Sequence, residues 1–419
     1  MSNAMNWDWD TREKRFAVGA WRDTFGWVEE PYVSPDGEKV AAIVRLEDES
    51  FSVCVNGDVW PVSFEKIWHL RFAPDGRLTA LVCDEGEWTV AVDGQPWESR
   101  FDYVWSPLFS ADGTRLAVAF QQGLKYGMAV EDVSWEARFA NMTDMAISPD
   151  GRHSAATVQT EGLSEGDIHT FEKGVFTSAV NGEAWSDCFI NAWGNAFSDC
   201  GAHLAAEVRL DREHYTIAVD GKRWNRTYAA VWEPRFKPGH ASVTASVRTP
   251  DGWTLARDGE LLWTGCFQQC WHHQYSPEGE DIAAIVSPEF GKWTIAVNGV
   301  PWRQRAKEFL TDMVFSPDGR RIAAAARSGE RWTVWVADSR WRSEFDRLWP
   351  PLFSPNGGQV AAKVQRDGRY TIAVNDKCWT HTCDAVWPPV FSPSGDKVLV
   401  RSIEEGSYYR RILPLAELS

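Results

Sequence analysis

The sequence predicts an all-β fold, a β-propeller of about ten four-stranded blades, and two observations carry this prediction. The first is a repeat of about 39 residues that runs through nearly the whole chain. The second is that the two ends of the chain carry complementary parts of one repeat. Turn residues interrupt every apolar run before a helix could form, so each repeat is predicted to be a small sheet.

Each repeat begins with a tight turn of the type Ser-Pro-Asp-Gly. Proline sets φ at the second position of such a turn, and glycine accepts a positive φ at its end. The first turn residue recurs at Ser34, Ala73, Ser110, Ser148, Ser198, Lys237, Ser276, Ser316, Ser354 and Ser392. Ten turns predict ten blades. Because propellers usually have about four to eight blades, two smaller propellers in one chain remain the alternative.

The rest of each repeat is typical of two β-hairpins. Residues 360–364 and 370–374 alternate apolar with polar or small side chains, as half-buried strands do. Asn-Gly or Asp-Gly pairs have the chemistry of type I′ hairpin turns, which need a positive φ twice. They begin at Asn56, Asp93, Asn181, Asp220, Asp258 and Asn298. Two hairpins make one four-stranded blade.

The chain ends are predicted to close the fold. Residues 16–21 are typical of the second half of a repeat, and residues 391–395 begin a repeat whose second half is degenerate. Pairing the two halves in one blade would leave no open sheet edge, giving a single ring around a central channel. Residues 1–4, ahead of Met5, are typical of an expression-tag remnant. We therefore expect one domain over 5–419, with a surface-loop insertion near 160–174.

The repeat resembles the bacterial WD40-like, TolB-type propeller family, on residues 315–319 (Phe-Ser-Pro-Asp-Gly) and 293–299 (Trp-Thr-Ile-Ala-Val-Asn-Gly). That family contains peptidase accessory domains, translocation factors and scaffolds, so the resemblance implies a fold and no single activity. The 25 tryptophans make the chain similar, more narrowly, to the tryptophan-rich D subunits of the Tmc electron-transfer complex of sulfate-reducing bacteria. This second likeness implies an accessory subunit of a membrane-associated redox complex, and no matched motif identifies a redox centre.

Two tryptophan series follow the repeat. The first follows the second hairpin of each unit and is predicted to pack between neighbouring blades, where a large ring fills the gap. Its members are Trp21, Trp60, Trp97, Trp135, Trp185, Trp224, Trp263, Trp302, Trp341 and Trp379. The second lies eight residues later, just before the first strand of the next blade, and is interrupted at Thr143 and Leu310. Its members are Trp68, Trp105, Trp193, Trp232, Trp271, Trp349 and Trp387.

The second series has two interpretations. Its rings either complete the core or form an aromatic collar at one rim of the channel, where they would anchor a partner. We take these seven tryptophans as the candidate partner-binding residues.

Possible metal ligands and carboxylates are weaker signals. Cys266, Cys270, His272 and His273 form the densest group of candidate ligands, and Cys378, His381 and Cys383 form a second group. Neither has the Cys-x2-Cys spacing common in zinc and iron–sulfur sites, so we expect no metal and no cofactor. The recurring aspartates are explained by the turn, where Asp bonds to its own backbone. They are Asp36, Asp75, Asp112, Asp150 and Asp318.

Catalytic motifs are missing from the sequence, and the charge favours a protein partner. There is no nucleophile elbow, phosphate loop or His-Glu-x-x-His pattern, so we expect no enzyme. The net charge of −16 argues against nucleic acid, which draws on clustered lysine and arginine, and is compatible with a protein that has a basic surface.

The predicted function is therefore a non-enzymatic protein-interaction or scaffold subunit. The alternative is a small-molecule or glycan-binding protein, or an enzyme, that uses the channel. No run approaches the roughly 20 apolar residues of a membrane span, and the start lacks a secretory-signal pattern. We thus expect a cytoplasmic location, peripheral to the inner membrane only through a partner.

Overall fold

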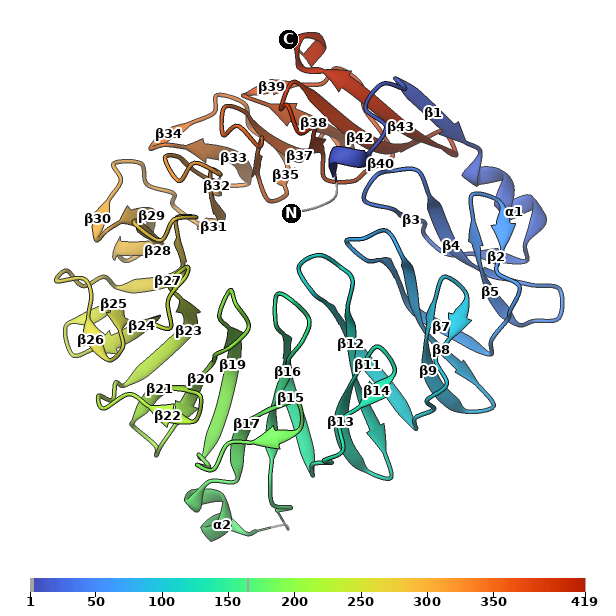
Figure 1. The fold of residues 1–419 in the computed structure, drawn as a ribbon. Coiled ribbons are helices and arrows are strands. Elements are labelled where there is room, and N and C mark those ends of the chain that lie inside the picture. The colour runs from blue at the N-terminus through green and yellow to red at the C-terminus, as the bar shows by residue number, and fades with distance from the viewer. Residues whose placement is uncertain (1–3, 164–165, 419) are drawn as a thin grey trace. The chain divides into compact units, whose positions relative to one another are not determined.

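The computed structural model describes residues 4–163 and 166–418, and its main elements are antiparallel strands (Figure 1). The strands form ten sheets, each with four strand positions. In nine sheets the four positions follow one another along the chain, and in the tenth the fourth strand comes from the N-terminus. The fold is thus all-β, a β-propeller of ten blades, as the repeat predicts. Residues 64–273 form one compact unit, and residues 4–63 and 274–418 form the other.

Five blades make up the first unit, each running from first to fourth strand in chain order. They are β7 (Lys66–Phe72), β8 (Leu78–Asp84), β9 (Glu87–Val92) and β10 (Gln95–Pro96); β11 (Tyr103–Phe109), β12 (Leu116–Gln122), β13 (Lys125–Val130) and β14 (Val133–Ser134); β15 (Asn141–Ile147), β16 (Ser154–Gln159), β17 (Phe176–Val180) and β18 (Glu183–Ala184); β19 (Asn191–Phe197), β20 (Leu204–Arg209), β21 (Tyr215–Val219) and β22 (Lys222–Arg223); and β23 (Ala230–Phe236), β24 (Val243–Thr249), β25 (Gly252–Arg257) and β26 (Glu260–Leu261).

The other five sheets belong to the second unit, except for the first residues of β27, which lie in the first. They are β2 (Trp27–Val28), β3 (Tyr32–Val33), β4 (Val40–Arg45), β5 (Phe51–Val55) and β6 (Asp58–Val59); β27 (Gln269–Tyr275), β28 (Ile282–Glu289), β29 (Lys292–Val297) and β30 (Val300–Pro301); β31 (Phe309–Phe315), β32 (Ile322–Ser328), β33 (Arg331–Val336) and β34 (Ser339–Arg340); β35 (Arg347–Leu348), β36 (Leu352–Phe353), β37 (Val360–Arg366), β38 (Arg369–Val374) and β39 (Lys377–Cys378); and β40 (Ala385–Val386), β41 (Val390–Phe391), β42 (Lys397–Glu404), β43 (Ser407–Pro414) and β1 (Glu13–Phe16).

In three blades the first strand is divided into two short pieces. The divisions fall at Pro31, at Pro350 and Pro351, and at Pro388 and Pro389. Proline has no backbone N–H to give to the ladder, so pairing with the second strand stops there.

The Ser-Pro-Asp-Gly turns are closed by their own side chains, as the sequence predicts. Ser110 Oγ donates to Asp112 Oδ1 at 2.6 Å and accepts a hydrogen bond from Arg115 N at 3.0 Å. Bonds from Ser110 and then from Thr114 lower the pKa of Asp112 to about 2. The same serine–aspartate bond closes the turns at residues 34–36, 148–150 and 316–318. These aspartates therefore serve the turns.

The Asn-Gly and Asp-Gly pairs form the expected hairpins. Asn56 and Gly57 have φ values of 52° and 107°, and Asp93 and Gly94 have 47° and 80°. The side chain also ties the hairpin to the second strand, because Asn56 Oδ1 accepts a hydrogen bond from Val40 N at 2.8 Å.

The two chain ends share one blade, which confirms their predicted pairing. Figure 1 shows β1 beside β43, and the pairing runs from Glu13 opposite Arg411 to Phe16 opposite Tyr408. The predicted division into two half-repeats is wrong, however. The C-terminal segment supplies three strand positions and the N-terminus one, because residues 407–414 form a regular third strand that a turn at residues 405–406 joins to the second strand.

Buried charges bind this closing blade to its neighbour in the second unit. The Arg410 side chain is fully buried, and its Nε lies 2.9 Å from Glu38 Oε1 and donates to the Asp36 carbonyl at 2.9 Å. Tyr408 Oη donates to the Gly37 carbonyl at 2.9 Å. Burial raises the pKa of Tyr408, so its hydroxyl keeps the proton it donates.

The first tryptophan series packs between blades, with one correction. The indole N–H of Trp135 donates to Ser154 Oγ in the next blade at 2.9 Å, and a Cβ on Gly182 of that blade would lie 3.3 Å from the tryptophan. Trp21 does not belong to the series. Four positions after each of the members from Trp97 to Trp379, a residue pairs with the third strand of the blade. In the closing blade that residue is Phe16, which pairs with Tyr408, and Trp21 comes after it and starts helix α1 (Trp21–Thr24).

The predicted insertion contains a short helix, α2 (Ile168–Lys173), beside the blade of β15 to β18 (Figure 1). Asp167 caps it by accepting a hydrogen bond from Thr170 N at 3.1 Å. Residues 164–165 of the insertion and residues 1–3 of the predicted tag remnant lie outside the described residues. The remaining helical turns are η1 (Ala4–Asn6), η2 (Val18–Ala20) and η3 (Leu415–Leu418).

Candidate functional site

The second tryptophan series lies inside the first strand of the blades, which corrects the prediction that it precedes that strand. Trp68, Trp105, Trp193, Trp232 and Trp271 are each the third residue of their strand, and Trp349 and Trp387 directly follow β35 and β40. These strands begin with polar residues, so the apolar pattern of the sequence does not indicate their first residues. The second interruption of the series lies at Thr311 and not at Leu310. Thr311 is the third residue of β31 and pairs with the second strand as the tryptophans do, whereas Leu310 is buried.

Six of these tryptophans pack on an aromatic residue of the third strand in their own blade: Trp68, Trp105, Trp193, Trp232, Trp349 and Trp387. The ring centroids of Trp68 and Trp88 are 4.5 Å apart, as are those of Trp232 and Trp253. Trp193 and Tyr215 are 6.1 Å apart at an interplanar angle of 72°. Such pairs contribute about 0.5–1.5 kcal/mol beyond the area that they bury. One side of each ring therefore has a structural role.

Two neighbouring blades join their rings into one aromatic face, which we define as Trp68, Trp88, Tyr103, Trp105 and Tyr126. Tyr103 links the blades, with its ring centroid 6.2 Å from Trp68, 5.5 Å from Trp88 and 6.0 Å from Trp105. Trp88 is buried, whereas Trp68 and Tyr103 are 44% and 37% exposed. The face is thus anchored in the core and open to solvent along its outer rings.

A β-bulge follows the tryptophan position in the first strand. The pairing of β7 with β8 shifts between Trp68 and Arg71, and His69 within the shift has a φ of 53°. Equivalent residues with positive φ in other blades are Ser106, Asp144, Gly194, Glu233, His272 and Asp312. A bulge leaves backbone N–H groups without a ladder partner. Side chains of neighbouring blades supply acceptors for several of them.

Three of these acceptors form a group that we call the carboxylate cluster: Asp144, Glu207 and Glu233. Asp144 Oδ2 accepts a hydrogen bond from Asn195 N at 2.9 Å. Glu207 Oε1 accepts from Glu233 N at 2.7 Å, and Glu233 Oε2 accepts from His272 N at 2.6 Å. Each member of the cluster therefore accepts a hydrogen bond from the strand that follows its own blade along the chain, and nothing in the spacing of these residues predicts it.

Glu207 is the most enclosed member of the carboxylate cluster. It is 4% exposed, and its Oε2 has no hydrogen-bond partner among the described residues. Burial raises its pKa to about 7, and the nearby Asp144 and Glu233 add to the rise, while the bonds from Glu233 N and the Trp193 indole oppose it. A Cβ on Gly194 would lie 2.8 Å from Glu207 Oε1. Glycine is thus required where this carboxylate fills the space below the bulge.

The candidate metal ligands do not converge. His273 is fully buried, its Nε2 lies 3.1 Å from the Thr244 carbonyl, and burial lowers its pKa to about 3. Burial raises the pKa of Cys270 to about 12, and Cys266 is exposed beside Thr249. Within residues 4–163 and 166–418, no three His, Cys, Asp or Glu side chains are placed to hold a metal ion.

The second group of candidate metal ligands, Cys378, His381 and Cys383, also makes other contacts. Cys383 Sγ lies 3.4 Å from Glu404 Oε1, and His381 Nε2 lies 3.4 Å from Glu404 Oε2. The His381 ring stacks on Trp379, with the centroids 5.0 Å apart. Burial and the neighbouring Glu404 raise the pKa of Cys383 to about 12, so this thiol is protonated.

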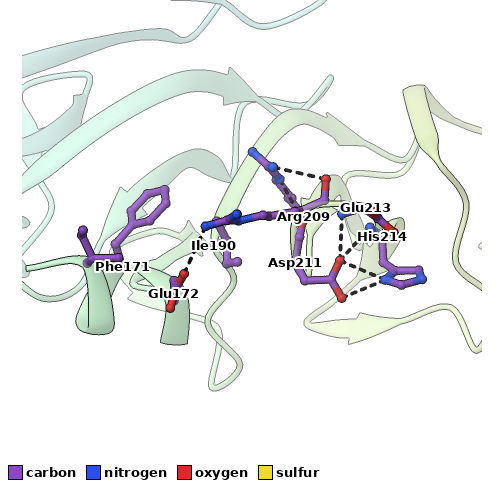
Figure 2. A pocket seen from close by; sticks show the side chains of 9 residues that line it. Phe171, Glu172, Ile190, Arg209, Asp211, Glu213 and His214 are labelled. Carbon is purple, nitrogen blue, oxygen red and sulfur yellow. Dashed lines mark hydrogen bonds and ion pairs between the residues drawn. The ribbon is translucent and has the colours of Figure 1, made fainter.

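A hollow of about 590 Å³ lies beside the insertion (Figure 2). Figure 2 shows Phe171 and Glu172 of α2 on one side of it and Asp211 and His214 on the other. Asp211 holds its loop by accepting hydrogen bonds from Glu213 N and His214 N at 2.9 Å. The sequence predicts only a surface loop here, and the mixed charges around the hollow select no ligand class.

Among the described residues, no helix is long and apolar enough to cross a membrane.

Comparisons with known proteins identify no family for this chain. No family model and no curated protein sequence matches it. Among solved structures, it is similar to a crystal structure described as the eukaryotic initiation factor, at 12% identity and a TM-score of 0.49, over 78% of this chain and 89% of that one. It is also similar to the β-propeller domain of Cps50 (Swd1) from Myceliophteria thermophila, at 13% identity and a TM-score of 0.31, over 64% and 95% of the chains. Neither likeness bears on function at these values.

Proposed function

We propose that this protein is a non-enzymatic interaction or scaffold subunit that holds a partner protein through the aromatic face. The observation that supports the proposal is the run of five touching rings in which Trp68 and Tyr103 remain well exposed. Large rigid aromatics dominate the energetics of protein interfaces, and these two are already held in place by their neighbours. Little side-chain entropy would then be lost on binding.

The partner in this proposal carries a basic surface. The net charge of −16 attracts such a surface at long range and raises the rate of association at low salt. The resemblance of the tryptophan content to the Tmc D subunits favours a subunit of a membrane-associated electron-transfer complex as that partner. We place the protein in the cytoplasm, at the inner membrane only through this partner.

The other candidate rim tryptophans contribute less in this proposal. Trp232 is 43% exposed, but its ring pairs only with Trp253 of its own blade among the described contacts. Trp271, Trp349 and Trp387 are partly buried. The aromatic face is therefore the surface to test first.

The test is capture of the partner from the native host by the wild-type protein, by Trp68→Ala and by Trp27→Ala. Trp27 is a matched control because it is 46% exposed and also rests on one aromatic residue, Phe51, but lies outside the aromatic face. Proteins that Trp68→Ala loses and Trp27→Ala keeps are identified by mass spectrometry. The strongest is then measured by surface plasmon resonance.

We expect Trp68→Ala to raise the dissociation rate of that partner at least tenfold, with Trp27→Ala within about twofold of wild type. The association rate should fall as salt rises from 0.1 to 1 M, because the screening length drops from about 10 Å to about 3 Å. Equal losses in the two variants, or capture that neither variant changes, would exclude the aromatic face as the binding surface. A salt-independent association rate would exclude the basic partner.

A further inference from the structure

The ten blades can be compared at one position, the second-strand residue that lies opposite the tryptophan position. Trp193 pairs with Glu207, and Trp232 pairs with Ser246. The residues at this position are Ile43, Leu81, Ala119, Thr157, Glu207, Ser246, Ile285, Ala325, Lys363 and Arg401. Glu207 is the carboxylate of this set. The fold of the repeat therefore does not require a buried carboxylate at this position, and Glu207 is a feature of its own blade.

The negative charge around Glu207 has no ion-pair partner among the described residues. Asp144 and Glu233 both raise its pKa through their charges. Within the described part of the chain, no lysine, arginine or histidine side chain forms an ion pair with Asp144, Glu207 or Glu233. Glu207 is buried and extends toward Glu233, with its Oε2 unpartnered. Buried carboxylates are normally paired, so a cation from outside the chain would complete this group.

Another blade shows which kind of cation fits beside such a ring pair. Lys363 occupies the same register position as Glu207, and its Nζ lies 4.3 Å from the ring centroid of Trp349 and 5.1 Å from that of Tyr370. Those two rings are 5.7 Å apart, compared with 6.1 Å for Trp193 and Tyr215. The ring pair of the repeat therefore accommodates an alkylammonium group, which aromatic faces attract.

We propose that Trp193, Glu207 and Glu233 form a binding site for an alkylammonium group, supplied by a lysine side chain of the basic partner. This inference rests on the proposed function for the identity of the lysine's owner. Trp193 and Glu233 are partly exposed and give access from solvent, while Glu207 provides the charge beneath the ring. The described residues offer no three-ligand metal site here, so an organic cation fits better than a metal ion.

The test uses n-butylammonium chloride as the probe, without any partner. The protein is labelled with 15N at its 25 tryptophans, and the indole signal of Trp193 is assigned by its loss in Trp193→Phe. The titration is done at pH 8, where Glu207 is mostly ionised. n-Butanol serves as the neutral control, sodium chloride and magnesium chloride as the inorganic controls, and Trp232→Phe as the matched variant over Ser246.

We expect a saturable shift of the Trp193 signal with n-butylammonium, a weakening of at least tenfold in Glu207→Gln, and no change in affinity in Trp232→Phe. Gln keeps an acceptor for Glu233 N, so this variant removes the charge and preserves the bulge. An unsaturated or missing shift, equal affinity in Glu207→Gln, or an equal response to n-butanol or magnesium would each overturn the proposal. Ammonium binding without partner capture by the aromatic face would support this site and contradict the proposed function. Partner capture by the aromatic face without ammonium binding would support the proposed function and contradict this site.

Discussion

Trp135→Ala should destabilise the protein much more than Trp232→Ala. Trp135 is 5% exposed, packs between two blades and donates its indole N–H to the buried Ser154 hydroxyl. Truncating a buried aromatic ring to alanine usually costs about 3–5 kcal/mol, because the cavity collapses only in part. Leaving the Ser154 hydroxyl without its donor adds about 1 kcal/mol. We therefore expect a loss of about 4–6 kcal/mol in the free energy of unfolding.

For Trp232→Ala the loss should be about 1–2 kcal/mol. The side chain is 43% exposed, so less apolar area returns to water, and its pairing with Trp253 contributes about 0.5–1.5 kcal/mol. Trp135 and Trp232 both lie in the unit of residues 64–273, so their effects appear in the same unfolding transition.

The assay is urea unfolding followed by circular dichroism. The comparison requires that the slope of the unfolding free energy against urea concentration is the same in all variants. Trp135→Phe is an informative intermediate, since it keeps most of the ring and removes the N–H donor, and it should lose about 1–2 kcal/mol. Equal losses for Trp135→Ala and Trp232→Ala, or a larger loss for Trp232→Ala, would show that the two tryptophan series do not differ as the structure indicates.

Three further predictions follow from the closing blade and from Glu207. Removing residues 5–16 deletes β1 and exposes the edge of β43, so the variant should self-associate in size-exclusion chromatography; a well-behaved monomer would argue against closure. Burial raises the pKa of Glu207 from 4.5 to about 7, so its contribution to stability is fully present below pH 4.5 and is lost as pH rises through 7. Relative to Glu207→Gln, wild type should lose about 3 kcal/mol of unfolding free energy over that window, and parallel pH profiles in urea unfolding would contradict this. Gly194→Ala places a Cβ 2.8 Å from Glu207 Oε1 at a φ of 66° and should cost about 1–2 kcal/mol. In the Glu207→Ala background the loss should shrink by about half, and additive losses in this double-mutant cycle would refute the steric reason.

Local chemistry made much of the fold predictable. The turn at residues 110–115 and the hairpin at residues 93–94 depend on residues within a few positions of one another, so their sequence determines their geometry. The predictions were wrong where residues were assigned to a position by their spacing in the sequence and the hydrogen-bond register of the strands differs from that spacing. Trp21 has the spacing of the first series but begins a helix, and Leu310 has the spacing of the second while Thr311 occupies the position. One extra residue in a connection is enough to separate spacing from register.

The sequence by itself determined the number of blades, the hairpin turns and the pairing of the chain ends, because a repeat of this length with Pro, Gly, Asn and Asp at fixed places restricts φ and ψ locally. Only the tertiary structure brought Asp144, Glu207 and Glu233 of three different blades together, and only it built the aromatic face across two blades. The side chain of Glu207 looks like any exposed acidic residue in the sequence. Its raised pKa comes from burial under Trp193 and Gly194 and from charges that are distant along the chain, which residue spacing does not encode.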